Sequence, residues 1–146
     1  MSLYEAIYKY IPVNEQEESD KKQMLQFIKE NTNYLERANQ TGHFTASMWT
    51  VNPERTKTLM IYHNVYHSWS WVGGHVKKGV WIPSHLHFNL TYLAEADEAE
   101  ELRIKEDENS AVKWWENEYA LKASTEPWMV DNIYRKLIKK QEQYRG

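Results

Sequence analysis

The chain has 146 residues, of which 41% are apolar and 27% are charged, and its formal net charge is −3. This composition excludes a disordered acidic chain and a strongly basic protein that binds nucleic acid through phosphates alone. We therefore expect one ordinary domain without specific nucleic-acid or membrane binding, since no apolar run reaches the roughly 20 residues of a membrane-spanning helix. No signal peptide is visible and no cysteine is present, which fits a cytoplasmic protein and excludes disulfides and thiolate metal sites.

The first part of the chain predicts helices. Apolar residues recur at helical spacing over residues 3–11 and stop at Pro12, which cannot continue a helix. A second apolar stripe covers residues 24–35, and Gly42 closes the region. The expected N-caps of the second helix are Ser19 and Asp20.

The middle of the chain predicts strands, because it is rich in β-branched and aromatic residues and partly alternates with period 2. The strand-like segments are residues 43–51, 56–65, 67–72 and 85–93. Asn52 and Pro53 mark a turn between the first two segments, which predicts a hairpin. The third segment ends in Gly73 and Gly74, a pair that lets the backbone turn tightly and approach a ligand.

The end of the chain predicts an acidic surface segment, a short strand and a terminal helix. Eight carboxylates lie between Glu95 and Glu108, and the following residues 111–118 are strand-like. The terminal helix has an apolar stripe and is expected to begin near Ser124 or Thr125. Together the segments predict an α/β fold, in which a mixed sheet is flanked by helices.

Three groups of residues could carry chemistry. His85 and His87 project to one side of a strand, and His63 and His67 are four residues apart, but the spacing supplies no third protein ligand for zinc. These side chains are otherwise ordinary hydrogen-bonded strand histidines. The acidic run at residues 106–108 could offer Mg²⁺ its preferred oxygen ligands or form a solvated turn. The tryptophans could stack on a nucleobase or fill the core.

Taken in order, these segments resemble the Nudix hydrolase family. The resemblance is carried by the two early strands, the strand that ends in Gly73 and Gly74, the strand at residues 85–93, and the Asp107–Asn109 turn before Trp114. It covers roughly residues 43–140. It implies an N-terminal helical extension at residues 1–42 and a truncated Nudix-like domain at residues 43–146, packed as one unit.

The catalytic box of that family, G-x5-E-x7-R-E-U-x-E-E-x-G-U with U aliphatic, does not fit this sequence. Counted from Gly74, its acidic and basic positions fall on Val80, Phe88, Asn89, Tyr92 and Leu93. Counting from Gly73 fails as well, and no R-E-x-x-E-E string occurs. We therefore expect a Nudix-like sheet without its box helix, with the join near His75. The apolar face beside strand 85–93 should be exposed or covered by a homodimer.

The resemblance implies a hydrolase that acts on nucleoside diphosphate-linked substrates with Mg²⁺ or Mn²⁺. Because the box is missing, we predict an inactive chain without catalytic residues; the alternative is a non-catalytic remnant that binds a nucleotide or a partner protein. The predicted substrate-binding residues are Trp71, Gly73 and Gly74. The predicted metal ligands are Glu108, Glu106 and Asp107, which match the auxiliary acidic loop of the family.

Overall fold

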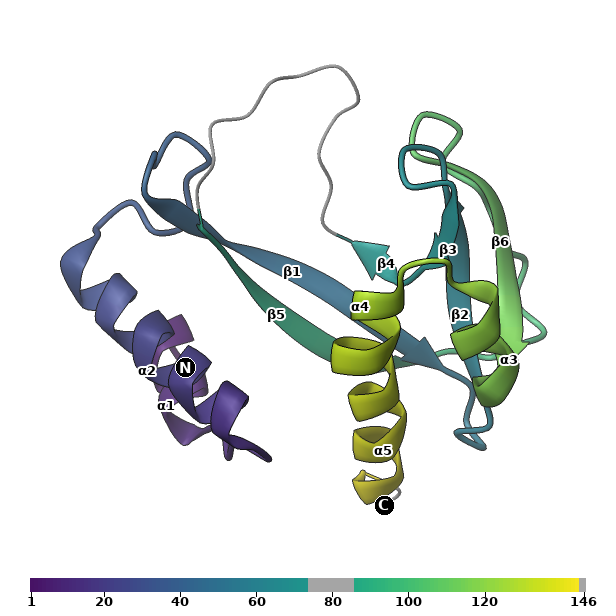
Figure 1. Cartoon of the computed structure of the whole chain (residues 1–146), viewed down its shortest axis with the longest axis horizontal. Coiled ribbons are helices and arrows are strands. Elements are labelled where there is room, and N and C mark those ends of the chain that lie inside the picture. The colour runs from purple at the N-terminus through teal and green to yellow at the C-terminus, as the bar shows by residue number, and fades with distance from the viewer. Residues whose placement is uncertain (74–85, 145–146) are drawn as a thin grey trace. The chain divides into compact units, whose positions relative to one another are not determined.

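The computed structural model describes residues 1–73 and 86–144, and it has a mixed α/β architecture with N-terminal helices, a mixed sheet and C-terminal helices (Figure 1). The predicted α/β class is confirmed in this form. The described chain divides into two compact units, which are treated separately below. The first unit contains residues 1–45 and 86–90, and the second contains residues 46–73 and 91–144. The domain boundary predicted at residue 42 stays a prediction.

The described strands belong to one sheet in which β1 pairs with three other strands. The strands are β1 (Gly42–Val51), β2 (Lys57–His63), β3 (Ser68–Ser70), β4 (Val72–Gly73), β5 (Leu86–Glu95) and β6 (Asn109–Glu116). Leu86 N–H donates to the carbonyl of Thr41, and Ala96 N–H donates to the carbonyl of Val51. Strands β1 and β5 therefore run in the same direction, whereas the pairs of β2 with β1, β3 and β6 are antiparallel.

The predicted hairpin is confirmed, and the predicted strand at residues 67–72 is divided into two. Strands β1 and β2 pair at Val51 and Thr58, next to the turn. Beyond that point the following segment pairs first with β2, through β3, and then with β1, through β4. Trp71 lies between β3 and β4, at the point where the chain changes its pairing partner.

Both N-terminal helices are present, with one correction at their ends. Helix α1 (Leu3–Lys9) begins with a capping box at Ser2, and α2 (Glu15–Glu30) begins at Asn14, whose side chain accepts from the N–H of Glu17. The expected caps at Ser19 and Asp20 were wrong, because Asn14 satisfies the free N–H one turn earlier. The stripe to residue 35 was also too long, since α2 ends at Glu30. No described helix is long and apolar enough to cross a membrane.

The first unit has its own aromatic core and a tight backbone contact at Gly42. Phe27 of α2 packs against Phe44 of β1 and Phe88 of β5, with ring centroids 6.2 and 4.8 Å away. A Cβ atom added to Gly42 would lie 2.7 Å from the carbonyl oxygen of Leu86. Glycine at this position therefore lets the start of β5 approach the start of β1.

We expect Gly42→Ala to lower the free energy of unfolding by about 1–3 kcal/mol, because the new methyl group overlaps backbone atoms that cannot move freely. Urea denaturation followed by circular dichroism measures this change. Thr41→Ala is the control, since the Thr41 side chain is exposed and only its backbone carbonyl bonds to β5. Equal stability of the two variants would contradict the role given to Gly42.

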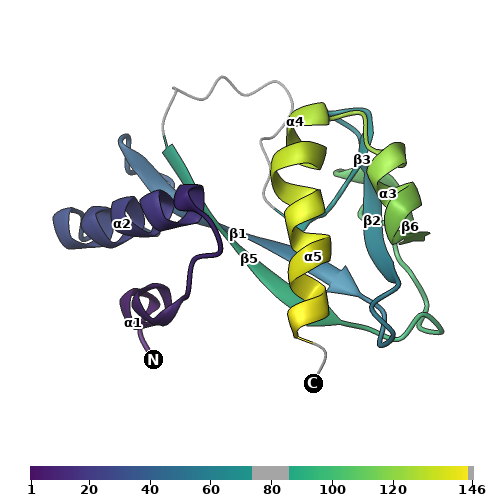
Figure 2. The same cartoon turned by 60° about the horizontal axis from the view of Figure 1, so that its bottom comes forward.

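The second unit places its C-terminal helices against β1 and β2 (Figure 2). They are α3 (Asn117–Ala123), α4 (Pro127–Met129), a π-helical turn (Val130–Tyr134) and α5 (Arg135–Gln143). The predicted terminal helix thus begins after Glu126 rather than at Ser124 or Thr125, because Pro127 suits a first helical position. Tyr134 is fully buried and stacks on Trp49, with ring centroids 5.5 Å apart.

A buried glutamine joins α5 to the hairpin. Gln141 is 1% exposed, and its Oε1 accepts from Trp49 Nε1 at 2.9 Å while its Nε2 donates to the carbonyl of Arg55 at 2.8 Å. The bond to Trp49 is buried, and the bond to Arg55 is partly buried. Gln141 therefore fixes the position of α5 on the strands of the second unit.

Gln141→Ala should destabilise the protein by roughly 2–4 kcal/mol, because each buried polar group left without a partner costs about 1–3 kcal/mol. Thermal and urea unfolding both report this loss. Gln143→Ala is the matched control, because Gln143 lies on the same helix and is exposed. If the two substitutions had equal effects, the amide of Gln141 would not be the contact that fixes α5.

Strand β5, whose apolar face was expected to be exposed, carries both exposed and covered apolar side chains. Leu86 and Tyr92 are 54% and 53% exposed, and Leu93 is 39% exposed. Phe88 and Leu90, by contrast, pack against the core of the first unit. The homodimer suggested for this strand stays a prediction, which analytical ultracentrifugation would test.

Candidate functional site

The predicted substrate-binding residues lie at the point where β3 passes into β4. Trp71 donates its backbone N–H to the hydroxyl oxygen of Tyr134 at 3.4 Å, and the two rings meet edge to face with centroids 5.8 Å apart. Gly73 ends β4 and pairs with Ser47 of β1. Gly74 lies outside the described residues. Of the three, Trp71 lines a cavity.

The predicted metal ligands lie in the turn before β6. Glu108 forms an ion pair with Lys105, at 2.5 Å between Oε1 and Nζ, and this hydrogen bond raises the pKa of Lys105. The backbone carbonyl of Glu106 accepts from the Asn64 side chain. A divalent cation at Glu108 would have to displace the Lys105 ammonium. These contacts are typical of a solvated, ion-paired turn rather than of a Mg²⁺ site. The role of Glu108, Glu106 and Asp107 as metal ligands stays a prediction.

The histidines do not form a metal centre within the described part of the chain, where no three His, Asp, Glu or Cys side chains are close enough to hold an ion. His87 lies beside His43, with ring centroids 4.7 Å apart. His85 lies outside the described residues. His63 is buried, and its Nδ1 accepts from the N–H of Val65 at 3.1 Å, which places the proton of the neutral ring on Nε2.

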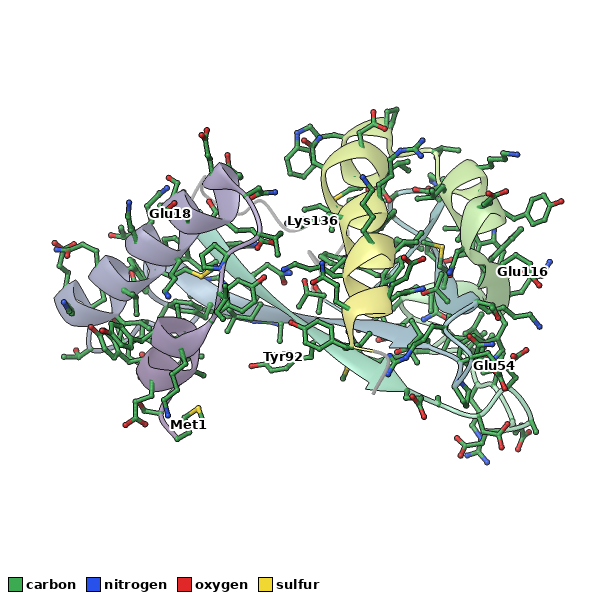
Figure 3. The ribbon with its side chains drawn as sticks, turned by 90° about the horizontal axis from the view of Figure 1, so that it is seen from below. Met1, Glu18, Glu54, Tyr92, Glu116 and Lys136 are labelled. Carbon is green, nitrogen blue, oxygen red and sulfur yellow. The ribbon has the colours of Figure 1, made fainter. Side chains whose placement is uncertain are left out.

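Part of the acidic segment has a structural role in the hairpin. Asn52 donates to Glu98 at 2.8 Å, and Lys57 donates to the other oxygen of Glu98 at 2.6 Å. The hydrogen bond between the two side chains lowers the pKa of Glu98 and raises the pKa of Lys57. The charges of Glu116 and Glu54, which Figure 3 labels, raise the pKa of Lys57 further. These charges are thus engaged in closing the β1–β2 turn.

A small cavity in the second unit collects polar groups from three separate segments. Its volume is about 130 Å³. The residues that line it come from the end of β2, the β3–β4 junction and the start of the C-terminal helices: His63, Tyr66, Ser70, Trp71, Glu126, Met129 and Tyr134. Four of these side chains are aromatic rings, and the lining as a whole is about as polar as it is apolar.

Glu126 is one of the residues that line this cavity. Its Oε1 atom is buried and has no hydrogen-bond partner among the described residues. Burial raises the pKa of Glu126, because the charged form loses water without gaining a donor. A carboxylate with a raised pKa in an aromatic cavity is a common feature of ligand sites.

Tyr134 supplies the second polar group. Its hydroxyl oxygen accepts from the backbone N–H of Trp71, so its proton can be donated to another group. Burial raises the pKa of Tyr134 well above its ordinary value, and the nearby charge of Glu126 raises it further. Tyr134 therefore stays neutral at physiological pH.

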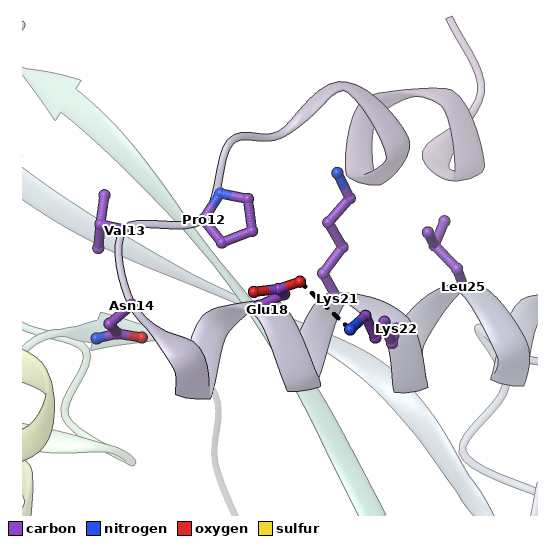
Figure 4. Close-up of a pocket in the computed structure, with 7 residues that line it drawn as sticks. All are labelled: Pro12, Val13, Asn14, Glu18, Lys21, Lys22 and Leu25. Carbon is purple, nitrogen blue, oxygen red and sulfur yellow. Dashed lines mark ion pairs between the residues drawn. The ribbon is translucent and has the colours of Figure 1, made fainter.

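A larger hollow of about 440 Å³ lies in the first unit, and its polar groups are already engaged (Figure 4). Lys21 Nζ donates to the carbonyls of Tyr8 and Tyr10, at 2.6 and 2.8 Å. Lys22 forms an exposed ion pair with Glu18 at 3.3 Å. This hollow is thus part of the α1–α2 connection, and the smaller cavity is the better candidate site.

Sequence reasoning found Trp71 and missed Glu126, Tyr134 and His63 as partners in one cavity. These residues lie far apart in the chain and match no spacing motif, so no local signal groups them. The sequence matches no protein-family model, and no curated protein is significantly similar to it. The chemistry of the cavity therefore provides the basis for assigning a function.

The raised pKa of Glu126 predicts a specific pH dependence of stability. The folded protein holds this proton more tightly than the unfolded chain, so the buried charge destabilises the fold as pH rises above the unfolded pKa of about 4.3. Glu126→Gln removes the charge, and its stability relative to wild type should increase from about pH 4 to about pH 7.

Urea denaturation of wild type and Glu126→Gln at both pH values measures this difference in stability. Glu118→Gln, an exposed substitution on α3, should follow the wild type. A Glu126→Gln curve parallel to that of wild type would show that Glu126 is not desolvated in the folded protein.

Proposed function

We propose that this chain is a Nudix-like framework without its catalytic box, which binds a nucleoside diphosphate-linked compound and does not hydrolyse it. The order of the early hairpin, the strand ending in Gly73, the parallel strand β5 and the C-terminal helices supports the resemblance. Many unrelated proteins share this α/β fold class, so the assignment to a Nudix-like framework depends on the sequence motifs quoted above.

The cavity beside Trp71 is the observation that carries this proposal. Its four aromatic side chains suit a flat heteroaromatic ring. Trp71 is followed directly by β4. A nucleotide presents both a flat base and a flexible phosphate chain.

The proposed lack of hydrolysis is supported by the residues that occupy the positions of the catalytic box. Diphosphate hydrolysis of the Nudix type needs several carboxylates that hold Mg²⁺ or Mn²⁺ and position water. None of the acidic positions of the box carries a carboxylate here, and Glu108 is paired with Lys105. Loss of general base catalysis alone costs about 10²–10⁴-fold in rate.

Differential scanning fluorimetry with ADP, GDP, CDP and UDP tests this proposal, with and without Mg²⁺. A bound nucleotide should raise the melting temperature, since a ligand at about 100 times its Kd adds about 2.7 kcal/mol of stability. Phosphate release assayed in the same samples should stay at the level of buffer. Turnover that depends on Mg²⁺ and is lost in Glu108→Gln would establish a hydrolase, and no shift with any nucleotide would refute nucleotide binding.

A further inference from the structure

Strand β5 forms an edge of the described sheet. Among the described strands it pairs with β1 alone. The stretch from Leu86 to Ala94 contains no Lys, Arg, Asp, Glu, Pro or Gly, although several of its side chains are exposed. A long edge strand without charges is able to pair with a strand of another chain through backbone hydrogen bonds.

Strand β6, by contrast, has features that protect an edge. Among the described strands it pairs with β2 alone, and it carries the exposed charges of Lys113 and Glu116. Its pairing with β2 also shifts register between Tyr62 and His63. Charged side chains and irregular pairing keep an edge from joining another sheet. Of these two strands, β5 is therefore the one whose sequence permits pairing with a second chain.

The pairing with β1 determines which backbone groups of β5 face outward. The N–H groups of Leu86 and Ala96 donate to the carbonyls of Thr41 and Val51. Successive residues of a strand direct their backbone groups to opposite edges, so the even-numbered residues of β5 face β1. The odd-numbered residues from 87 to 95 therefore direct their N–H and C=O groups to the outer edge.

The outer edge of β5 is complementary to itself in the antiparallel direction. Antiparallel strands exchange two hydrogen bonds between opposite residues whose backbone groups face each other. A twofold axis at Thr91 places His87 opposite Glu95 of a second copy. Asn89 then lies opposite Leu93, and Thr91 lies opposite itself. This register is the longest one that matches outward-facing residues within β5.

The charges at the two ends of this register are also complementary. An imidazole N–H of His87 can donate to the carboxylate of the opposite Glu95. Glu95 already pairs with Arg55 at 3.2 Å, but its side chain is 51% exposed and leaves space for a second donor. No two carboxylates or two cations face each other across the axis. A second copy of this chain therefore fits the edge better than a strand of arbitrary sequence.

The length of the edge sets the strength of the contact. Residues 87–95 span about 30 Å at about 3.3 Å per residue. One pair of strands of this length gives an interface at the low end of the range, below about 1,200 Å² in total, for which weak and reversible association is typical. Tyr92, which is 53% exposed, would lie opposite Leu90 of the second copy and lose apolar surface to water.

We propose that two copies of this chain associate through the outer edges of their β5 strands, which pair antiparallel about a twofold axis at Thr91. The contact extends the sheet of one copy into the sheet of the other. It does not depend on nucleotide binding, so the two proposals are tested separately.

Cysteine substitution tests the register, because the natural chain contains no cysteine. In Thr91→Cys the two Cα atoms face each other at about 5.5 Å, within the range of about 4.4–6.8 Å that a disulfide spans. Mild oxidation with diamide should therefore link this variant into a covalent dimer. In Leu93→Cys the two positions lie about 13 Å apart along the paired strands and should link much more slowly.

Ser110→Cys is the control for random collision, since Ser110 is exposed on β6. Gel electrophoresis without reducing agent measures the linked fraction in each variant, and circular dichroism establishes that each variant folds. Linking of Leu93→Cys or Ser110→Cys as fast as Thr91→Cys would overturn the proposed register.

A matched pair of substitutions tests the charge complementarity. His87→Glu places a carboxylate opposite Glu95 and should weaken dimerisation at least about tenfold, because like charges directly opposite are destabilising. His87→Lys keeps a cationic donor at the same place and should retain the dimer. Equal dimerisation of the two variants would contradict the pairing of His87 with Glu95.

Sedimentation equilibrium of the wild-type chain measures the association itself. A monomer–dimer equilibrium that is weakened by His87→Glu supports the proposal. A wild-type chain that stays monomeric up to millimolar concentration overturns it. A wild-type dimer whose Thr91→Cys variant does not link also overturns it, because the copies would then associate through another surface.

Discussion

The two hydrogen bonds of Gln141 are the interaction on which the second unit depends. They hold α5 between the buried indole of Trp49 and the partly buried carbonyl of Arg55. Tyr134 belongs to the same helical run and stacks on the same indole, so its position follows from this attachment. The cavity wall formed by Tyr134 and Trp71 is therefore a consequence of how α5 is anchored.

The turn between β1 and β2 presents the backbone carbonyl to which Gln141 donates. Arg55 has a positive φ of 61°, a conformation that costs a non-glycine residue roughly 1–3 kcal/mol. Its carbonyl accepts from Gln141 Nε2 and from Asn117 Nδ2, and these two bonds offset the strain. Asn52 secures the other side of the turn by accepting from the N–H groups of Thr56 and Lys57. One turn thus connects β1, β2, α3 and α5.

The contrast between the two hollows explains why size alone does not identify a site. The larger one, beside α2, has lysines whose ammonium groups already donate to carbonyls or pair with Glu18. The smaller one keeps a desolvated carboxylate at Glu126, which weakens the fold at neutral pH. A group that costs stability and lines a cavity fits a binding role better than a structural one, because nothing in the described fold compensates for it.

The sequence by itself determined the elements that local physics controls. Pro12 ended α1, the Asn52-Pro53 pair marked the hairpin, and the alternation before Gly73 indicated a strand. It misplaced the caps, since Asn14 and Ser19 are equally good N-caps until the chain direction before α2 is known. Only the tertiary structure could bring Trp71, Glu126 and Tyr134 together. Their proximity depends on the pairing of β3 with β2, on the pairing of β4 with β1, and on the packing of α5. The spacing of residues along the chain predicts local secondary structure and does not predict such long-range contacts.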